Sequence, residues 1–216
     1  MFVLCIVNMF DYKKSVEILA WLLRKYNRTA TKIMLIKLLF FADKYHLRKY
    51  GRTVSGDEYK AMNYGPVASK TLNVANIDEN WLPPAACALA SEVLELTHGG
   101  KTVNLIKDIE FTSLSESDIE ALSFAYDTFG KQNPFALVEL THLYPEWKKH
   151  KKEILTEDNP AGKKSVNMDI RDFLEEPPDG LNPCFKLAEE DKKIILDLIN
   201  ESESFDKFFK ARNNVA

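Results

Sequence analysis

Asp43 and His46 have the spacing that best suits chemistry in this sequence, because residues three apart share one face of a helix. With His142 from another segment, they could form a metal site of two histidines and one carboxylate. No His-x-x-x-His pair reinforces that site. The alternative is that His46 and His142 are core histidines whose ring nitrogens bond within the fold.

Other catalytic chemistry has less support. The sequence has no GxSxG nucleophile motif, and no Walker loop or GxGxxG motif that would hold a phosphate. Cys5, Cys87 and Cys184 have no neighbouring histidine and are too few and too widely spaced for a disulfide framework. Reduced thiols in the cytoplasm are the simplest interpretation. We therefore expect a cytoplasmic binding protein that is not an enzyme and holds no cofactor or metal.

Charge is distributed unevenly along the 216 residues. The net charge is −3, yet residues 12–52 contain eleven lysines and arginines against two acids, Glu17 and Asp43. Such a segment can contact a nucleic acid or steer the chain toward an acidic protein. It can also be the solvated face of two helices that pair with acidic helices elsewhere in the chain.

Nucleic-acid binding is the second interpretation of this pattern. Aromatic residues lie among the basic ones in 44–60 and 147–152, and such aromatics can stack on a single-stranded nucleic acid. The composition is not basic overall, however, and buried tyrosines would explain the aromatics equally well. We therefore expect no nucleic-acid partner.

Two helices are predicted to position the candidate residues. The first runs from Tyr12 to Tyr26, with Asp11 as its N-cap. The second runs from Lys32 to Tyr50 and ends at Gly51. Because the second helix is apolar nearly all round through Phe41, we expect it at the centre of a core.

The rest of the chain reads as shorter elements. The tetrad 64–67 (Tyr-Gly-Pro-Val) predicts a turn into a helix that begins at Pro66 and fades by Asn76. Residues 93–97 and 102–106 flank Gly99-Gly100 and predict a β-hairpin. Further helices are predicted to begin after Ser115, at Asn133-Pro134 and at Pro145, and a short one over 169–175.

The predicted fold class is mostly α: a single compact helical domain with one small antiparallel β-hairpin and a C-terminal helical appendage. We place the domain at 1–176 and a linker with a C-terminal helical extension at 177–216, because 176–183 is rich in proline. The apolar segment Met1–Phe10 lacks the flanks of a signal peptide, and 33–42 is too short to span a membrane. No membrane partner is expected.

Three blocks of sequence occur in order between about residues 31 and 152. The first is KLLFFADKYHL (37–47) followed by Gly51, and the second is DEYKAMNYGPV (57–67). The third runs from Leu114-Ser115 through Phe129-Gly130 and Thr141-His142 to Trp147. Together they resemble the Panacea domain, also called the SocA-like antitoxin-associated domain, of bacteria and phages. Phe40 stands where that family has tyrosine.

The resemblance implies an antitoxin. Members of the family neutralise a protein toxin, usually encoded by the adjacent gene, chiefly by direct contact; the toxins include enzymes that halt translation or deplete nucleotides. One branch instead delivers its toxin to a bacterial protease, so a protease is the alternative partner.

The candidate residues fall into two groups. A structural role in turns and core is expected for Lys37, Leu38, Leu39, Phe41, Gly51, Gly65, Pro66 and Val67. Contact with the toxin is the hypothesis for Asp43, Lys44, Arg48, Tyr64, Trp81, His142 and Trp147. Trp81 and Trp147 are expected on exposed turns, where aromatic side chains can anchor an interface.

Overall fold

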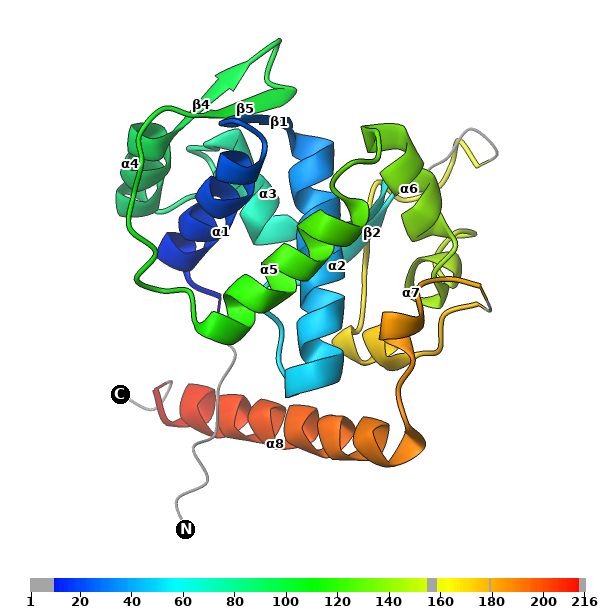
Figure 1. Cartoon of the computed structure of the whole chain (residues 1–216). Helices are drawn as coiled ribbons and strands as arrows, with labels where there is room; N and C mark the ends of the chain where they lie inside the picture. Colours follow the sequence, from blue (N-terminus) through cyan, green and yellow to red (C-terminus); the bar gives the residue numbers. More distant parts are fainter. Residues whose placement is uncertain (1–9, 155–158, 179, 214–216) are drawn as a thin grey trace.

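The central element is the long helix α2 (Lys32–Tyr50), around which the other elements pack (Figure 1). The computed structural model describes residues 10–154, 159–178 and 180–213. Residues 35–44 of α2 are all buried, so the prediction of a core helix is confirmed. Thr31 caps its first turn by accepting from the Met34 N–H, and Gly51 ends it with φ of 73°.

The other helices cover α2 on separate sides. In Figure 1, α1, α3 and α4 lie to the left of α2, α5 crosses in front, α6 and α7 lie to the right, and α8 passes beneath. Their bounds are α1 Tyr12–Lys25, α3 Ser69–Asn76, α4 Pro84–Val93, α5 Glu116–Phe129, α6 Pro134–His142, α7 Pro145–Lys148 and α8 Glu189–Asn213. The sequence analysis did not predict α4.

The predicted helix starts are confirmed by their caps. Asp11 accepts from the Lys13 and Lys14 N–H groups at the start of α1. Ser115 and Asp118 form a reciprocal capping box at the start of α5. Asn133 caps α6, with a proline at the first helical position.

One sheet contains the predicted hairpin. Strands β4 (Leu94–Thr97) and β5 (Thr102–Leu105) pair antiparallel around the glycine turn. A third strand that the sequence analysis missed, β1 (Thr29–Thr31), pairs with β5 on its other side. Because the two residues before β1 have positive φ, the chain turns sharply from α1 into it.

A second antiparallel sheet was not predicted at all. It has the order β3-β2-β6, from β2 (Tyr59–Met62), β3 (Gly65–Ala68) and β6 (Val166–Asn167). The predicted helix start at Pro66 is therefore wrong, since α3 begins only at Ser69. Pro66 is tolerated in β3 because this strand is at the edge of its sheet, where a missing N–H breaks no ladder bond. The fold is mostly α as predicted, but it carries two three-stranded sheets instead of one hairpin.

The C-terminal region is partly built into the core. The short 3₁₀ helices η1 (Ile170–Leu174) and η2 (Pro183–Phe185) contribute Phe173 and Phe185, and both rings are fully buried. Phe185 stacks parallel to Phe129 at 6.4 Å between ring centroids. The segment that the sequence assigns to a linker thus fills a gap beside α2.

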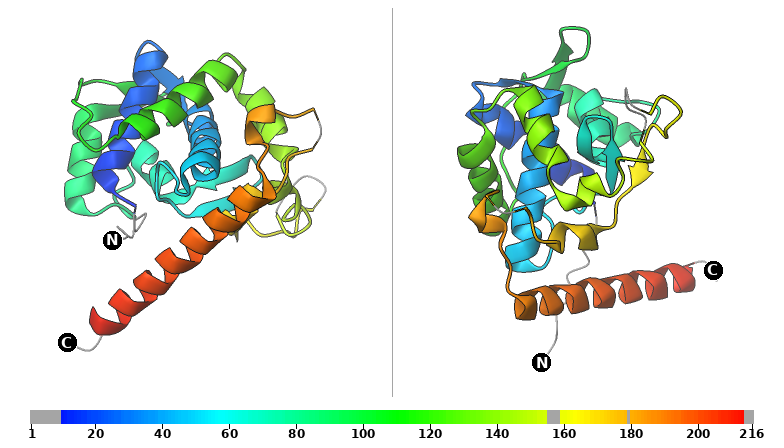
Figure 2. Two further views of the ribbon diagram at one scale, coloured as in Figure 1. Left: turned by 60° about the horizontal axis from the view of Figure 1, so that its bottom comes forward. Right: turned by 90° about the vertical axis from the view of Figure 1, so that its right-hand side faces the viewer.

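Helix α8 rests on this core through Ile195 and Ile199, which are buried. Figure 2 shows that it crosses beneath the body and continues past it. No helix among the described residues is long and apolar enough to cross a membrane. Met1–Met9, including Cys5, lies outside the described residues, whereas Cys87 and Cys184 are free thiols.

Candidate functional site

The turn between β2 and β3 is fastened to the core by Lys37. Its side chain is fully buried, and its Nζ donates to the Pro66 carbonyl at 2.7 Å. Burial lowers the pKa of Lys37 to about 7. Gly65 has φ of 90°, and a Cβ there would lie 2.4 Å from Thr141 Oγ1 and 2.8 Å from Lys37 Nζ. The first and second sequence blocks therefore meet in one tightly packed contact.

Three of the seven contact candidates converge on this turn. The Trp147 indole donates to the Met62 carbonyl at 2.9 Å, and the His142 ring stacks on Trp147 with 3.7 Å between centroids. Burial lowers the pKa of His142. Tyr64 itself is 55% exposed, whereas Trp147 is 3% exposed. The prediction of an exposed Trp147 is wrong, because its ring fills the space between α7 and the turn.

Asp43 lies in a different part of the interior. Its carboxylate accepts from the Ser55 N–H at 2.9 Å, the Ser55 hydroxyl at 2.5 Å and the Tyr59 hydroxyl at 2.7 Å. Burial raises the pKa of Asp43 to about 6, against the lowering effect of these hydrogen bonds. The carboxylate thereby holds the loop before β2 against α2.

Lys44 and Arg48 bind the C-terminal region to α2. Lys44 Nζ lies 2.9 Å from Glu146 Oε1, and both side chains are fully buried. Lys44 and Arg48 each donate to the Phe173 carbonyl at 2.9 Å, and Arg48 also pairs with Glu176. Burial lowers the pKa of Lys44 and raises that of Glu146, while their mutual attraction opposes both shifts.

These placements correct part of the contact hypothesis. The side chains of Asp43, Lys44 and Arg48 bond to the protein's own interior, so a partner cannot reach them in this structure. Tyr64 and Trp81 are exposed, the latter by 71%. Trp81 belongs to the α3–α4 connection, and α4 lies on the far side of α2 from α6 (Figure 1).

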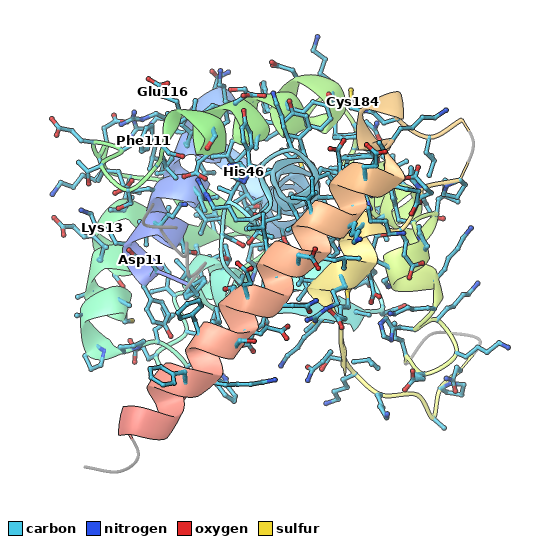
Figure 3. The ribbon with its side chains drawn as sticks, turned by 90° about the horizontal axis from the view of Figure 1, so that it is seen from below. Asp11, Lys13, His46, Phe111, Glu116 and Cys184 are labelled. Atoms are coloured by element: carbon cyan, nitrogen blue, oxygen red, sulfur yellow. The ribbon has the colours of Figure 1, made fainter. Side chains whose placement is uncertain are left out.

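The three residues of the candidate metal site are not brought together. Within the described residues, no group of three or more His, Cys, Asp or Glu side chains is placed to hold a metal ion. His46 instead bonds through Nδ1 to the Arg52 carbonyl at 2.7 Å and through Nε2 to the Ser117 hydroxyl at 3.0 Å. Figure 3 shows His46 in the interior, with Lys13 and Glu116 at the periphery. His46 is thus a core histidine with both ring nitrogens satisfied.

The family model "Antitoxin SocA-like, Panacea domain" matches residues 35–148, just over half of the chain. The chain belongs to this family. No curated protein and no solved structure matches it. The Panacea match spans the elements from α2 to α7 and includes the Lys37 and Gly65 contact, whereas η1 and α8 lie outside it.

The basic segment of this Panacea protein is largely neutralised inside the fold. Arg24 and Arg28 share Asp108, and Lys14 and Arg52 share Asp118. The other pairs with acids beyond residue 52 are Lys44–Glu146, Arg48–Glu176 and Lys49–Glu120. The interpretation that the segment pairs with acidic helices elsewhere in the chain is confirmed for the pairs with α5 and α7, whereas Asp108 and Glu176 lie outside the helices. The segment is therefore not the free positive surface that steering would need.

Sequence reasoning missed two exposed apolar residues beside the Tyr64 turn. Phe135 and Leu143, on and just after α6, are 65% and 45% exposed. The buried face of α6 includes Leu137, Val138 and Thr141. The sequence did contain a signal for this surface, because Phe135 is an apolar residue that does not lie on the buried face of α6. The sequence analysis did not use it.

The burial of His46 predicts a pH dependence of stability. Desolvation lowers its pKa to about 4 in the folded chain, from 6.5. Between these values the unfolded chain binds a proton that the folded chain does not, so the contribution of His46 to stability falls as the pH drops from 6.5 to 4. The loss should be on the order of 2 kcal/mol.

The measurement is urea unfolding of the wild type and of His46→Gln across this pH range. Asp43 titrates in the opposite sense, because its raised pKa favours the folded state as the pH drops from 6 to 4. The difference between the two proteins is therefore the quantity to follow. A difference that stays constant with pH would contradict the prediction.

Proposed function

We propose that this chain is the antitoxin of a toxin–antitoxin pair and that it neutralises a cognate protein toxin by binding it directly. The observation that carries the proposal is the Panacea match, which covers the central helix and the packed turn at Gly65. The toxin is proposed to be a translation-inhibiting or nucleotide-metabolising enzyme encoded beside this chain, and both proteins are proposed to act in the cytoplasm.

We further propose that the chain acts by occupying the toxin, without catalysis of its own. The polar side chains that looked most suited to chemistry are used to hold the fold together. Asp43 binds the loop before β2, and His46 bonds to the Arg52 carbonyl and the Ser117 hydroxyl. A protein that works by occlusion needs a stable scaffold and a complementary surface, and these internal bonds supply the scaffold.

The test is a growth assay of the adjacent reading frame, induced alone and together with this chain. We expect the neighbour to stop growth and this chain to restore it, with the two proteins co-purifying. A harmless neighbour would overturn the proposal. Immunoblots of the toxin distinguish occlusion from delivery to a protease: occlusion leaves the toxin's half-life unchanged, whereas delivery shortens it and needs an active host protease.

A further inference from the structure

We propose that the toxin docks on one face of α6 and the β2–β3 turn, and that the docked surface is acidic with an apolar pocket. We call this the α6 face and define it by the apolar residues Tyr64, Phe135 and Leu143 and the lysines Lys148, Lys151 and Lys152. The inference rests on the proposed function and adds the place of contact and the chemistry of the partner surface.

The apolar part of the α6 face follows one stripe of the helix. Phe135, Glu139 and His142 are four and three residues apart, so they lie along one side of α6, and Leu143 follows directly. This side is opposite to the one that Leu137 and Thr141 bury against the core. Phe135 and Leu143 therefore project into solvent from a rigid element.

The β2–β3 turn brings Tyr64 to the end of this stripe. The His142 ring, at the end of α6, stacks on Trp147, whose indole donates to the Met62 carbonyl at the start of the turn, and a Cβ on Gly65 would touch Thr141. Tyr64 is thus held beside the last turn of α6. Because Gly65 is locked between Lys37 and Thr141, the tyrosine is carried on a turn that is already ordered before a partner arrives.

Three exposed lysines lie beyond the C-terminal end of α6, at the end of α7 and just after it. Lys148, Lys151 and Lys152 are exposed, and none of them makes an ion pair with a described residue. Lys149, by contrast, pairs with Asp172. Lys151 lies close enough to contribute to the lowered pKa of His142. These lysines have no ion-pair partner among the described residues, and their positive charge is complementary to an acidic surface; the basic residues of 12–52, by contrast, are mostly paired.

The combination favours a protein over a nucleic acid. An interface hot spot consists of apolar anchors beside a polar rim, and the α6 face offers the exposed apolar anchors Phe135 and Leu143 with exposed lysines beyond one end of α6. An aliphatic side chain such as Leu143 offers no stacking plane to a base.

Several other exposed apolar residues lie either on the opposite side of α2 or outside the family match. Trp81 and Ile106 are exposed beside α4 and β5, on the other side of α2 (Figure 1). The apolar residues Ile194 and Leu198 on α8 lie outside the Panacea match. The α6 face is within the match except for Lys151 and Lys152, and it combines exposed apolar residues with lysines that make no ion pair with a described residue.

The experiment uses the purified full chain and the purified toxin, which is the product of the adjacent gene whose growth arrest the wild-type chain relieves. Two variants remove the two parts of the face: Phe135→Asp, and the triple Lys148→Glu/Lys151→Glu/Lys152→Glu. Two matched controls make the same changes elsewhere on the surface: Ile106→Asp, and Lys101→Glu/Lys186→Glu/Lys193→Glu. All of these side chains are exposed, so the fold should be retained, which thermal unfolding checks.

We expect Phe135→Asp to weaken the Kd by at least about thirtyfold and to abolish rescue. The triple variant should lower the association rate about tenfold at low salt, and the difference should shrink as salt is added. The controls should bind and rescue like the wild type. Wild-type binding and rescue in both α6-face variants would overturn this proposal and leave the antitoxin function standing.

Two further outcomes would count against the docking assignment. Equal losses in the variants and their controls would show a general effect of surface charge. Binding of wild type to a single-stranded 20-nucleotide RNA, lost in the triple variant while rescue persists, would assign the face to nucleic acid. A harmless neighbour would overturn the proposed function itself, and this assignment with it.

Discussion

Replacing Lys44 by methionine is expected to destabilise the fold by about 3–5 kcal/mol, because it leaves the Glu146 carboxylate buried without its counter-charge. Both side chains are fully buried, and Glu146 Oε2 has no hydrogen-bond partner among the described residues. The 2.9 Å contact with Lys44 is thus the direct ion pair of that carboxylate. The measurement is urea unfolding followed by far-UV circular dichroism at pH 7.

The double variant Lys44→Met/Glu146→Leu should recover most of this loss. When both charges are replaced by apolar groups of similar size, the desolvation penalty disappears together with the attraction. The Phe173 carbonyl keeps a donor in this variant, because Arg48 also reaches it at 2.9 Å. Recovery in the double variant would show that the unpaired Glu146 carboxylate causes the loss of stability. It would exclude the lost hydrogen bond from Lys44 to the Phe173 carbonyl of η1 as the cause.

An exposed ion pair provides the control. Lys107 pairs with Glu92 on the surface, where both side chains are more than half exposed. Lys107→Met should change the free energy of unfolding by less than about 1 kcal/mol. A Lys44→Met variant as mild as this control would mean that water reaches Glu146 in the folded chain.

The elements that could be predicted are those whose signals are local. The Asp11, Ser115 and Asn133 caps each lie within three residues of the backbone groups they satisfy. The position of α2 followed from its own pattern, because a helix that is apolar all round has to be enclosed. Such information is carried by neighbouring residues and needs no knowledge of the tertiary structure.

The elements that were missed depend on distant segments. The strand Gly65–Ala68 is specified by pairing with β2 and by the Lys37 bond, whereas its Gly-Pro sequence favours a turn when read alone. The two-residue strand β6 pairs with β2 across about a hundred residues of chain. Short strands of this kind carry little pattern of their own.

The candidate site could be predicted only in part, because the sequence identifies residue types but not the distant residues that they contact. The sequence identified Asp43, Lys44 and Arg48 as candidate toxin contacts, but charge alone does not say whether a side chain faces solvent or a buried partner. Glu146 and the Phe173 carbonyl, which decide the matter for Lys44, are 102 and 129 residues away along the chain. Tyr64 was identified by its motif, whereas Phe135 emerged only once its exposure was seen.

Gly65→Ala is expected to cost about 2–5 kcal/mol, the second large effect that the structure predicts. An alanine at positive φ is strained by about 1–2 kcal/mol, and the crowding of its Cβ by Thr141 Oγ1 and Lys37 Nζ adds about 1–3 kcal/mol. Gly100→Ala is the matched control. Gly100 also has positive φ, but nothing lies within 4 Å of a Cβ there, so only the backbone strain should appear.

The crowding can be separated from the strain by a second substitution. Thr141→Ala removes the nearer of the two obstructing atoms, so Gly65→Ala/Thr141→Ala should cost less than the sum of the two single variants. Relief would be partial, because the buried Lys37 Nζ remains 2.8 Å from the new Cβ. Strictly additive costs would show that β3 moves away from α6. In that case Tyr64 would move with it, and Gly65→Ala should weaken toxin binding even at temperatures where the variant stays folded.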